Sequence, residues 1–251
     1  MKKRKLGFSS KAGEVIRHDE YLSLVYNDIY KTFFELSGSN KKHRVLELGA
    51  GEFTLSDRFW NEVTKSDIQT NPDNKNLLKI DADAIDLPTA QYDLVIAKDA
   101  LHHFKKPLVS LASIMRLLAP GGMFIVSEPM WSPLGKFIFR FFHPENWDAS
   151  PVSLNLDSDD PWEGNQALLY LLSSDWKSTM QREIPGIIVS LEVSTYGFSY
   201  LLSGGVHSRT PIPSSALKRI YHFEKNRQRL MKFVGLNKIA VFQLTTTSEK
   251  V

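Results

Sequence analysis

Two hydrophobic periods alternate along the first half of the chain. Between residues 14 and 37, apolar side chains such as Leu22, Val25 and Ile29 recur every three or four positions, which predicts an amphipathic helix. Short apolar runs then alternate with segments of helical spacing. This alternation is typical of an α/β fold, in which helices cover both faces of a parallel sheet. The predicted strands are residues 44–48, 62–67, 77–80, 92–97 and 123–127, and the helices between them are residues 54–62 and 108–118.

The pattern changes after Glu128. Residues 130–185 are irregular and rich in aromatic side chains, with one predicted helix at 165–177. Two later segments alternate like a terminal antiparallel pair of strands, and a predicted helix lies between them. The chain therefore predicts an α/β fold with a doubly wound, mostly parallel seven-stranded sheet and helical cap insertions. The late strands are residues 186–196 and 237–246, and the helix between them is residues 215–234.

This pattern divides the chain into four segments. The first is an N-terminal helical segment, residues 1–40, and the second is the nucleotide-binding type of core, residues 41–129. The cap insertion is residues 130–185. The last segment, residues 186–251, holds the antiparallel strands and an inserted loop and helix at 197–235.

Composition narrows the class of protein. The 251 residues carry 31 Lys and Arg against 28 Asp and Glu, a net charge of +3, which is too small to indicate a nucleic-acid partner. No cysteine is present, so thiolate metal sites and cysteine nucleophiles are excluded, and a reducing, cytoplasmic location is expected. No apolar run approaches the roughly 20 residues of a membrane span. The basic start, residues 1–5, is expected to be a solvated tail.

The stretch Val45–Phe53, VLELGAGEF, carries the first chemical signal. A strand that runs into a glycine loop lets the backbone approach a ligand at the carboxyl edge of a parallel sheet, and several nucleotide-binding families use this device. Asp67 lies 18 residues after Gly49, at the end of the second predicted strand, where a carboxylate can accept both hydroxyls of a ribose. Glu47 and Glu52 flank the loop. They would repel a diphosphate and suit a ligand that carries an ammonium and a sulfonium group.

With these residues the chain resembles the class I S-adenosylmethionine-dependent methyltransferases, of the type 11 subgroup, which have a Rossmann-like fold. Five segments match in family order: VLELGAGEF (45–53), VTKSDI (63–68), DADAIDLP (81–88), YDLVIAKDALHHF (92–104) and LLAPGGMFIVSEP (117–129). The family has a third glycine where this chain has Phe53, which puts the shape of the loop in question. The resemblance implies that S-adenosyl-L-methionine is bound by Glu47, Gly49, Ala50, Gly51, Glu52, Phe53, Asp67, Ile68, Asp83 (with Asp81 as its alternative), Ala84 and Lys98.

Methyl transfer needs a nucleophile in line with the sulfonium methyl, exclusion of water and, for a hydroxyl or amine acceptor, a base. His102 and His103 follow the fourth predicted strand, and His143 and His207 lie in the inserted segments. These four histidines are the candidate bases, although His102 and His103 occur widely in this family as part of a structural loop. No group of His, Asp and Glu has metal-ligand spacing in the sequence, so no required metal is expected.

The insertions are expected to bind the acceptor. Trp162 stands among acidic residues, a combination that suits sugars, and WSPLGKFIFRFF (131–142) interleaves aromatic and basic residues as an interfacial segment would. DDPWEGNQAL (159–168) and LSGGVHSRTPIP (202–213) resemble segments of methyltransferases from bacterial surface-polysaccharide synthesis. This resemblance implies O-methylation of a glycan or lipid-linked sugar precursor. The segment 131–142 adds the expectation of peripheral membrane contact. The alternatives are methylation of a quinone-like or natural-product ring, and a catalytically inactive cofactor-binding module.

Overall fold

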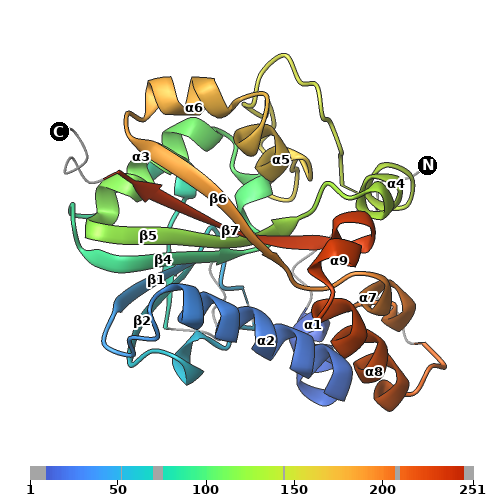
Figure 1. Cartoon of the computed structure of the whole chain (residues 1–251). Coiled ribbons are helices and arrows are strands. Elements are labelled where there is room, and N and C mark those ends of the chain that lie inside the picture. Colours follow the sequence, from blue (N-terminus) through green and yellow to red (C-terminus); the bar gives the residue numbers. More distant parts are fainter. Residues whose placement is uncertain (1–9, 52, 70–75, 144, 207–209, 246–251) are drawn as a thin grey trace.

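The computed structural model describes residues 10–51, 53–69, 76–143, 145–206 and 210–245 (Figure 1). Helices and short 3₁₀ turns alternate with strands as far as Pro129, and helices predominate afterwards. The elements, with η marking a 3₁₀ turn, are α1 (Ser10–His18), α2 (Glu20–Leu36), β1 (Arg44–Leu48), η1 (Ser56–Arg58), β2 (Glu62–Asp67), β3 (Leu77–Lys79), η2 (Ala82–Ala84), β4 (Tyr92–Lys98), η3 (Leu101–His103), α3 (Pro107–Leu117), β5 (Leu118–Pro129), α4 (Pro133–Phe141), α5 (Leu168–Ser173), α6 (Lys177–Glu183), β6 (Ile187–Ser194), α7 (Phe198–Ser203), α8 (Ser214–Lys225), α9 (Gln228–Val234) and β7 (Asn237–Leu244).

The strands form one seven-stranded sheet in the order β3-β2-β1-β4-β5-β7-β6. The first five strands pair in parallel, and β7 pairs antiparallel with both β5 and β6. The prediction of a mostly parallel seven-stranded sheet with a terminal antiparallel pair is therefore confirmed. Since β1 and β4 are neighbours at the centre, the loops that leave their carboxyl ends lie next to each other.

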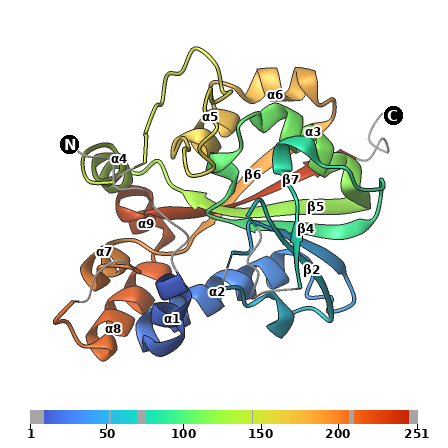
Figure 2. The same ribbon diagram turned by 180° about the vertical axis from the view of Figure 1, so that it is seen from behind.

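Both faces of the sheet are covered by apolar layers, as a doubly wound fold requires. In Figures 1 and 2, α3, α5 and α6 lie on one face, and α1, α2 and α8 lie on the other. The first layer packs around Leu111, Leu171 and Phe242. The second packs around Ile29, Phe33 and Tyr221. The central strands β1, β4, β5 and β7 are largely buried between these layers, which explains their apolar sequences, whereas β2, β3 and β6 are partly exposed.

Three predicted helices are not continuous in the structure, and side-chain hydrogen bonds mark two of the breaks. The helix expected at 14–37 is interrupted at Asp19, whose side chain accepts the N–H groups of Tyr21 and Leu22 and begins α2 there. The helix expected at 165–177 is replaced by α5 and α6, and the one at 215–234 by α8 and α9. In the last case the side chain of Gln228 exchanges two 3.1 Å hydrogen bonds with the backbone of Ser194, which turns α9 toward the end of β6.

The helix predicted at residues 54–62 is wrong. Only the short turn η1 forms there. The side chains of Thr54 and Ser56 are bound to the carboxylate of Glu47, and Trp60 is buried against Phe34 of α2. These anchors at both ends leave too few residues for a regular helix.

The long connections surround the carboxyl edge of the parallel strands. The segment between β5 and β6 holds α4, α5 and α6, and the segment between β6 and β7 holds α7, α8 and α9. Figures 1 and 2 place α4 and α9 side by side, and these two helices are in contact. Among the helices that the structure describes, none combines the length and the apolarity that a bilayer crossing needs.

Candidate cofactor-binding and catalytic site

A cavity of about 310 Å³ opens at the carboxyl edge of β1, β2 and β4. Parallel α/β sheets bind ligands at this edge. The cavity is lined by eleven of the residues singled out from the sequence, together with residues from α1 and α2. The eleven are Gly49, Ala50, Gly51, Phe53, Asp67, Ile68, Asp81, Asp83, Lys98, His103 and Trp162.

The glycine loop after β1 needs its glycines for two different reasons. Gly49 and Gly51 have φ values of +68° and +55°, which side chains disfavour. A Cβ at Gly49 would also stand 2.6 Å from the Cβ of Ala100, whereas a Cβ at Gly51 would have no neighbour within 4 Å. Gly49 therefore permits contact with the loop after β4, and Gly51 leaves the backbone open toward the cavity.

Asp67 connects the end of β2 to this loop. Its Oδ2 accepts the N–H of Gly51 at 3.1 Å, and its Oδ1 accepts the N–H of Gln69 at 2.9 Å. Burial raises the pKa of Asp67, while the N–H groups of Gln69 and Gly51 oppose that shift. Each oxygen keeps a further lone pair, because a carboxylate has about four acceptor positions. Asp67 can therefore hold the loop and accept hydrogen bonds from a ligand.

Glu47 lies inside the protein and does not line the cavity. Its side chain is 2% exposed and accepts hydrogen bonds from the hydroxyls of Tyr30, Thr54 and Ser56 at 2.5–2.6 Å. Burial raises the pKa of Glu47, and the hydroxyl hydrogen bonds counteract this rise. Its carboxylate thus ties β1 to α2 and to the segment after the glycine loop. Because Glu47 does not face the cavity, this geometry does not support its expected role of repelling a diphosphate and attracting a cationic ligand. Glu52, the second flanking acid, lies outside the described residues.

The ring of Phe53 turns toward the N-terminal helices. It meets Tyr26 edge-on, with ring centroids 5.9 Å apart, and the guanidinium of Arg17 lies 5.4 Å from its centroid. The ring also lines the cavity. The chain therefore accommodates a phenylalanine at the third-glycine position by packing it between the helices and the loop.

Asp81 and Asp83 both line the cavity but have different partners. Asp83 accepts the N–H groups of Lys105 and Lys106 at 2.8 and 2.9 Å, and a hydrogen bond from Ser110, so its oxygens are engaged with the segment that starts α3. Asp81 is exposed, and its Oδ1 accepts the N–H of Asp83. Ala84 is exposed and does not line the cavity. Of the two acids, Asp81 is the more available to a ligand.

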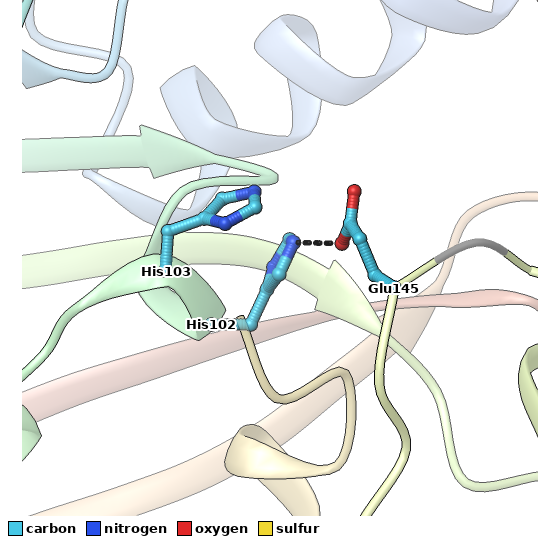
Figure 3. A group of neighbouring side chains, drawn as sticks. All are labelled: His102, His103 and Glu145. Carbon is cyan, nitrogen blue, oxygen red and sulfur yellow. Dashed lines mark ion pairs between the residues drawn. The ribbon is translucent and has the colours of Figure 1, made fainter. Parts of the chain in front are cut away.

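The two histidines after β4 have opposite surroundings. His102 is buried, with its Nδ1 2.5 Å from Oε2 of Glu128 and its Nε2 3.2 Å from Oε2 of Glu145 (Figure 3). Burial alone would lower the pKa of His102, but Glu128 and Glu145 outweigh it and raise the pKa to about 10. The same pairing with His102 outweighs the burial of Glu145 and lowers its pKa to about 2. His102 is therefore a charged link between the core and the cap insertion.

His103 lines the cavity, and its ring centroid is 4.2 Å from that of His102. Burial and the neighbouring charge of His102 lower the pKa of His103 to about 4, so its imidazole is neutral near pH 7. His143 follows α4, where its Nδ1 accepts the N–H of Glu145 at 3.3 Å, and it does not line the cavity. His207 lies outside the described residues. Of the four candidate histidines, His103 is the one that the described structure places at the cavity.

Residues 37–126 match the model of the methyltransferase domain family. Over this stretch the chain is similar to a methyltransferase domain. The matched range runs from β1 into β5 and so includes the glycine loop, Asp67 and both histidines after β4. The site has the features that S-adenosylmethionine requires: an open glycine loop, an acid at the end of β2 and a largely apolar cavity.

Curated relatives of the methyltransferase domain include two ubiquinone/menaquinone biosynthesis C-methyltransferases. The protein from Pasteurella multocida is 28% identical over 159 residues, which are 54% of this chain and 59% of that protein. The protein from Psychromonas ingrahamii is 27% identical over 154 residues, 52% of this chain and 61% of that protein. The chain therefore spans about three fifths of the length of these relatives.

A solved structure with the same fold is a SAM-dependent methyltransferase from Archaeoglobus fulgidus. It is 15% identical, with a TM-score of 0.50, and the match covers 88% of this chain and 94% of that one. At this identity the likeness establishes the fold.

The structure adds cavity residues that sequence reasoning did not single out. Asp99 directly follows β4, has a φ of +51° and pairs with the ammonium of Lys98. That ammonium also lies 4.2 Å from the ring centroid of Tyr26. Asp99 could have been singled out from the sequence, because it is an acid at the end of a predicted strand. By contrast, nothing in the sequence linked the N-terminal helices to the methyltransferase site. The added cavity residues include Ala12, Gly13, Ile16, Tyr26, Tyr30, Asp99 and Ala100.

Proposed function

We propose that the chain transfers a methyl group from S-adenosylmethionine to a small acceptor held beneath the cap insertion. One cavity joins the glycine loop and Asp67 to Trp162 of the cap insertion, and this observation carries the proposal. The methionine part would lie along Gly49 and Gly51, and the ribose hydroxyls would donate to Asp67. Asp81 would face the adenine in preference to Asp83, because the oxygens of Asp83 are engaged elsewhere.

The reaction is a displacement at the methyl carbon. The acceptor atom forms a bond to the methyl carbon while the carbon–sulfur bond breaks, and S-adenosylhomocysteine leaves as a neutral thioether. A hydroxyl acceptor also releases one proton. Two side chains at the cavity could take it: the carboxylate of Asp99 and the neutral imidazole of His103. The cavity walls would hold the two reactants together and exclude water, and such positioning supplies much of the rate.

The segment around Trp162 supports a hydroxylated acceptor, such as a glycan precursor. The ammonium of Lys105 binds the backbone carbonyls of Asp160 and Glu163, the latter at 3.1 Å, and so fixes this segment over the cavity. The ring of Trp162 meets His103 edge-on, with centroids 6.3 Å apart. A fixed aromatic ring with carboxylates beside it can stack on a sugar and accept bonds from its hydroxyls. This arrangement favours O-methylation of a glycan or lipid-linked sugar.

A quinone-like ring is the second candidate acceptor. The names of the curated relatives and the aromatic side chains around the cavity support it. A flat apolar ring could lie between Trp162 and Phe104. It would be methylated at carbon and would not need the carboxylates beside Trp162, so the two candidates differ in the residues they require.

The exposed face of α4 supports contact with a membrane that carries a lipid-linked acceptor. Phe137, Phe141 and Phe142 are 51%, 63% and 68% exposed, and the ring centroid of Phe137 lies 5.4 Å from that of each of the other two. Lys136 and Arg140 are exposed on the same helix. Exposed phenylalanines with basic neighbours are typical of helices that lie in the interface of an anionic bilayer.

A methyl-transfer screen tests the proposal. The full chain would be incubated with S-adenosylmethionine labelled in its methyl group, and with extract fractions that separate lipid-linked glycans, soluble sugars and quinones. We expect labelled product in a glycan fraction, and none with the Asp67→Ala variant. Label in the quinone fraction would assign the second candidate. Cofactor binding without turnover in any fraction would favour an inactive cofactor-binding module and contradict the proposed activity.

A further inference from the structure

His102, His103 and Glu145 converge beside the methyltransferase cavity, although they come from different segments. Figure 3 shows the two histidines on the turn after β4 and Glu145 on the loop that follows α4. One potential ligand atom from each residue lies within 4.8 Å of the other two. The separation from Nε2 of His102 to Oε2 of Glu145 is 3.2 Å. Neighbouring ligands bound at about 2.0–2.1 Å to one ion are roughly 3.0–3.3 Å apart, so this pair already has the spacing of a metal site.

The surroundings of the three side chains resemble the outer shell of a metal site. Glu128 is 1% exposed and sits behind His102, with its Oε2 on the Nδ1 of the imidazole. Its other oxygen accepts the N–H groups of Ala100 and Leu101 at 3.0 and 2.8 Å. A metal-binding histidine almost always donates its second nitrogen to such a carboxylate, which fixes the ring and makes the ligand nitrogen more basic.

The other two side chains are also held in place. The side-chain amide of Gln166 donates to Oε2 of Glu145, and Nδ1 of His103 lies 3.4 Å from the carbonyl oxygen of Glu163. Gly164 packs so closely on both histidines that a Cβ there would be 2.8 Å from Nδ1 of His103. The cap insertion thus orients Glu145 and His103 toward His102.

We infer that His102, His103 and Glu145 bind a divalent transition-metal ion at the edge of the methyltransferase cavity. Two imidazoles and one carboxylate suit Zn²⁺, Co²⁺ and Fe²⁺ better than Mg²⁺ or Ca²⁺, which prefer oxygen ligands. Three protein ligands leave coordination positions open, and His103 places them at the cavity. No required metal was expected from the sequence, because Glu145 is far from the two histidines in the chain and their spacing does not indicate a shared site.

The role of the ion rests on the proposed function. An oxygen of the acceptor would occupy an open position, where the ion lowers the pKa of its hydroxyl. The lone pair of His103 would then be used by the ion, and Asp99 would be left to receive the proton. The metal site would therefore select an acceptor whose reacting atom is a hydroxyl oxygen or lies next to a hydroxyl group.

Metal binding can be measured without any acceptor. The full chain would be treated with a chelator, dialysed and titrated with ZnCl₂ by calorimetry and with CoCl₂ by visible absorption. We expect one Zn²⁺ per chain and the absorption bands of histidine-bound Co²⁺. Glu145→Gln and His103→Asn should each lower the affinity at least tenfold, and Glu128→Gln should lower it about 10–100-fold through His102. His222→Asn, which removes an exposed histidine of α8, should leave the affinity unchanged.

The binding of S-adenosylmethionine to each variant reports whether it is folded and tests the proposed function separately. No saturable binding of Zn²⁺ or Co²⁺ by the wild-type chain would overturn the inference. Equal affinity in the wild type and a folded Glu145→Gln variant would overturn it as well. Metal binding by a chain that does not bind S-adenosylmethionine would leave the metal site standing and contradict only the proposed function.

Discussion

Gly49 lies so close to Ala100 that a Cβ built on the glycine would stand 2.6 Å from the Cβ of the alanine. This approach joins the loop after β1 to the loop after β4, and Asp99 immediately precedes Ala100. A ligand on the glycine loop is therefore adjacent to Asp99. The contact explains how one cavity can serve both the cofactor and the acceptor.

Gly49→Ala and Gly51→Ala form a matched pair that tests this contact. Both glycines have positive φ values, so both substitutions strain the backbone by roughly 1–2 kcal/mol. Only the methyl group at position 49 also collides with Ala100. We expect Gly49→Ala to lower the melting temperature and the affinity for S-adenosylhomocysteine more than Gly51→Ala does, as measured by thermal unfolding and calorimetry. Equal losses in the two variants would show that the approach to Ala100 is unimportant.

Asp67→Ala is expected to weaken cofactor binding while the fold is retained. Hydrogen bonds to a charged group contribute roughly 1.5–3 kcal/mol each, so losing two bonds to the ribose would lower the affinity by at least two orders of magnitude. The variant also loses the bond from Gly51 to Asp67. Asp67→Asn is the control, since its amide oxygen can still accept that bond. An unchanged affinity for S-adenosylhomocysteine in Asp67→Ala would exclude a ribose contact.

The mostly parallel sheet and the site at its carboxyl edge could be predicted from the sequence, because they depend on local signals. Buried parallel strands have continuous apolar runs, and Gly49, Gly51 and Asp67 stand at strand ends, where topology alone brings them together. The roles of Glu47 and Asp83 could not be predicted. Their partners, such as Tyr30 for Glu47 and Ser110 for Asp83, lie 17 and 27 residues away in the chain, and sequence spacing does not report such contacts.

The contacts that the insertions make could not be predicted from the sequence either. Glu145 reaches His102 from a segment with no regular period, and α1 covers the cavity although its sequence has no ligand-binding motif. The divided helices have a related cause. The helical period of the sequence continues through Asp19 and Gln228. The cap at Asp19 depends on its backbone φ and ψ values, and the turn at Gln228 depends on a hydrogen bond to the distant strand β6, so the sequence period shows neither.

In the metal-free chain, the link between His102 and Glu145 predicts how stability depends on pH. The pKa of His102 is raised to about 10, so its stabilising effect is complete below the unfolded value near 6.5 and is lost as the pH rises toward 10. The pKa of Glu145 is lowered to about 2, so its effect is present above 4.5 and is lost as the pH falls toward 2. Both effects are complete between about pH 4.5 and 6.5.

Glu145→Gln should therefore be most destabilising in that window. Urea unfolding of the wild type and the variant, both treated with a chelator, at pH 6, 8 and 10 would give the difference in the free energy of unfolding. We expect this difference to shrink as the pH rises, because the wild type loses the proton on His102 and other groups titrate equally in both chains. A difference that stays constant from pH 6 to 10 would contradict the charged pairing of His102.

The exposed phenylalanines of α4 predict binding to anionic lipid. Phe137→Ser combined with Phe141→Ser should reduce co-sedimentation with vesicles of mixed neutral and anionic phospholipid. Removing Lys136 and Arg140 should reduce it mainly at low salt, since charge attraction to the surface is screened. Phe223→Ser is the control, because Phe223 is 51% exposed on α8, away from these residues. Identical sedimentation of the α4 variants and the wild type would exclude this face as the contact.

Asp99→Asn and His103→Asn distinguish the two proton acceptors. Both side chains lie at the cavity, and general-base catalysis contributes roughly 10²–10⁴-fold to the rate. If the inferred ion binds at His103, Asp99 is the base, and Asp99→Asn should lower turnover by this factor with little change in cofactor affinity. His103→Asn should then lower turnover together with the affinity for Zn²⁺. A His103→Asn variant that loses turnover but keeps its Zn²⁺ affinity would instead make His103 the base.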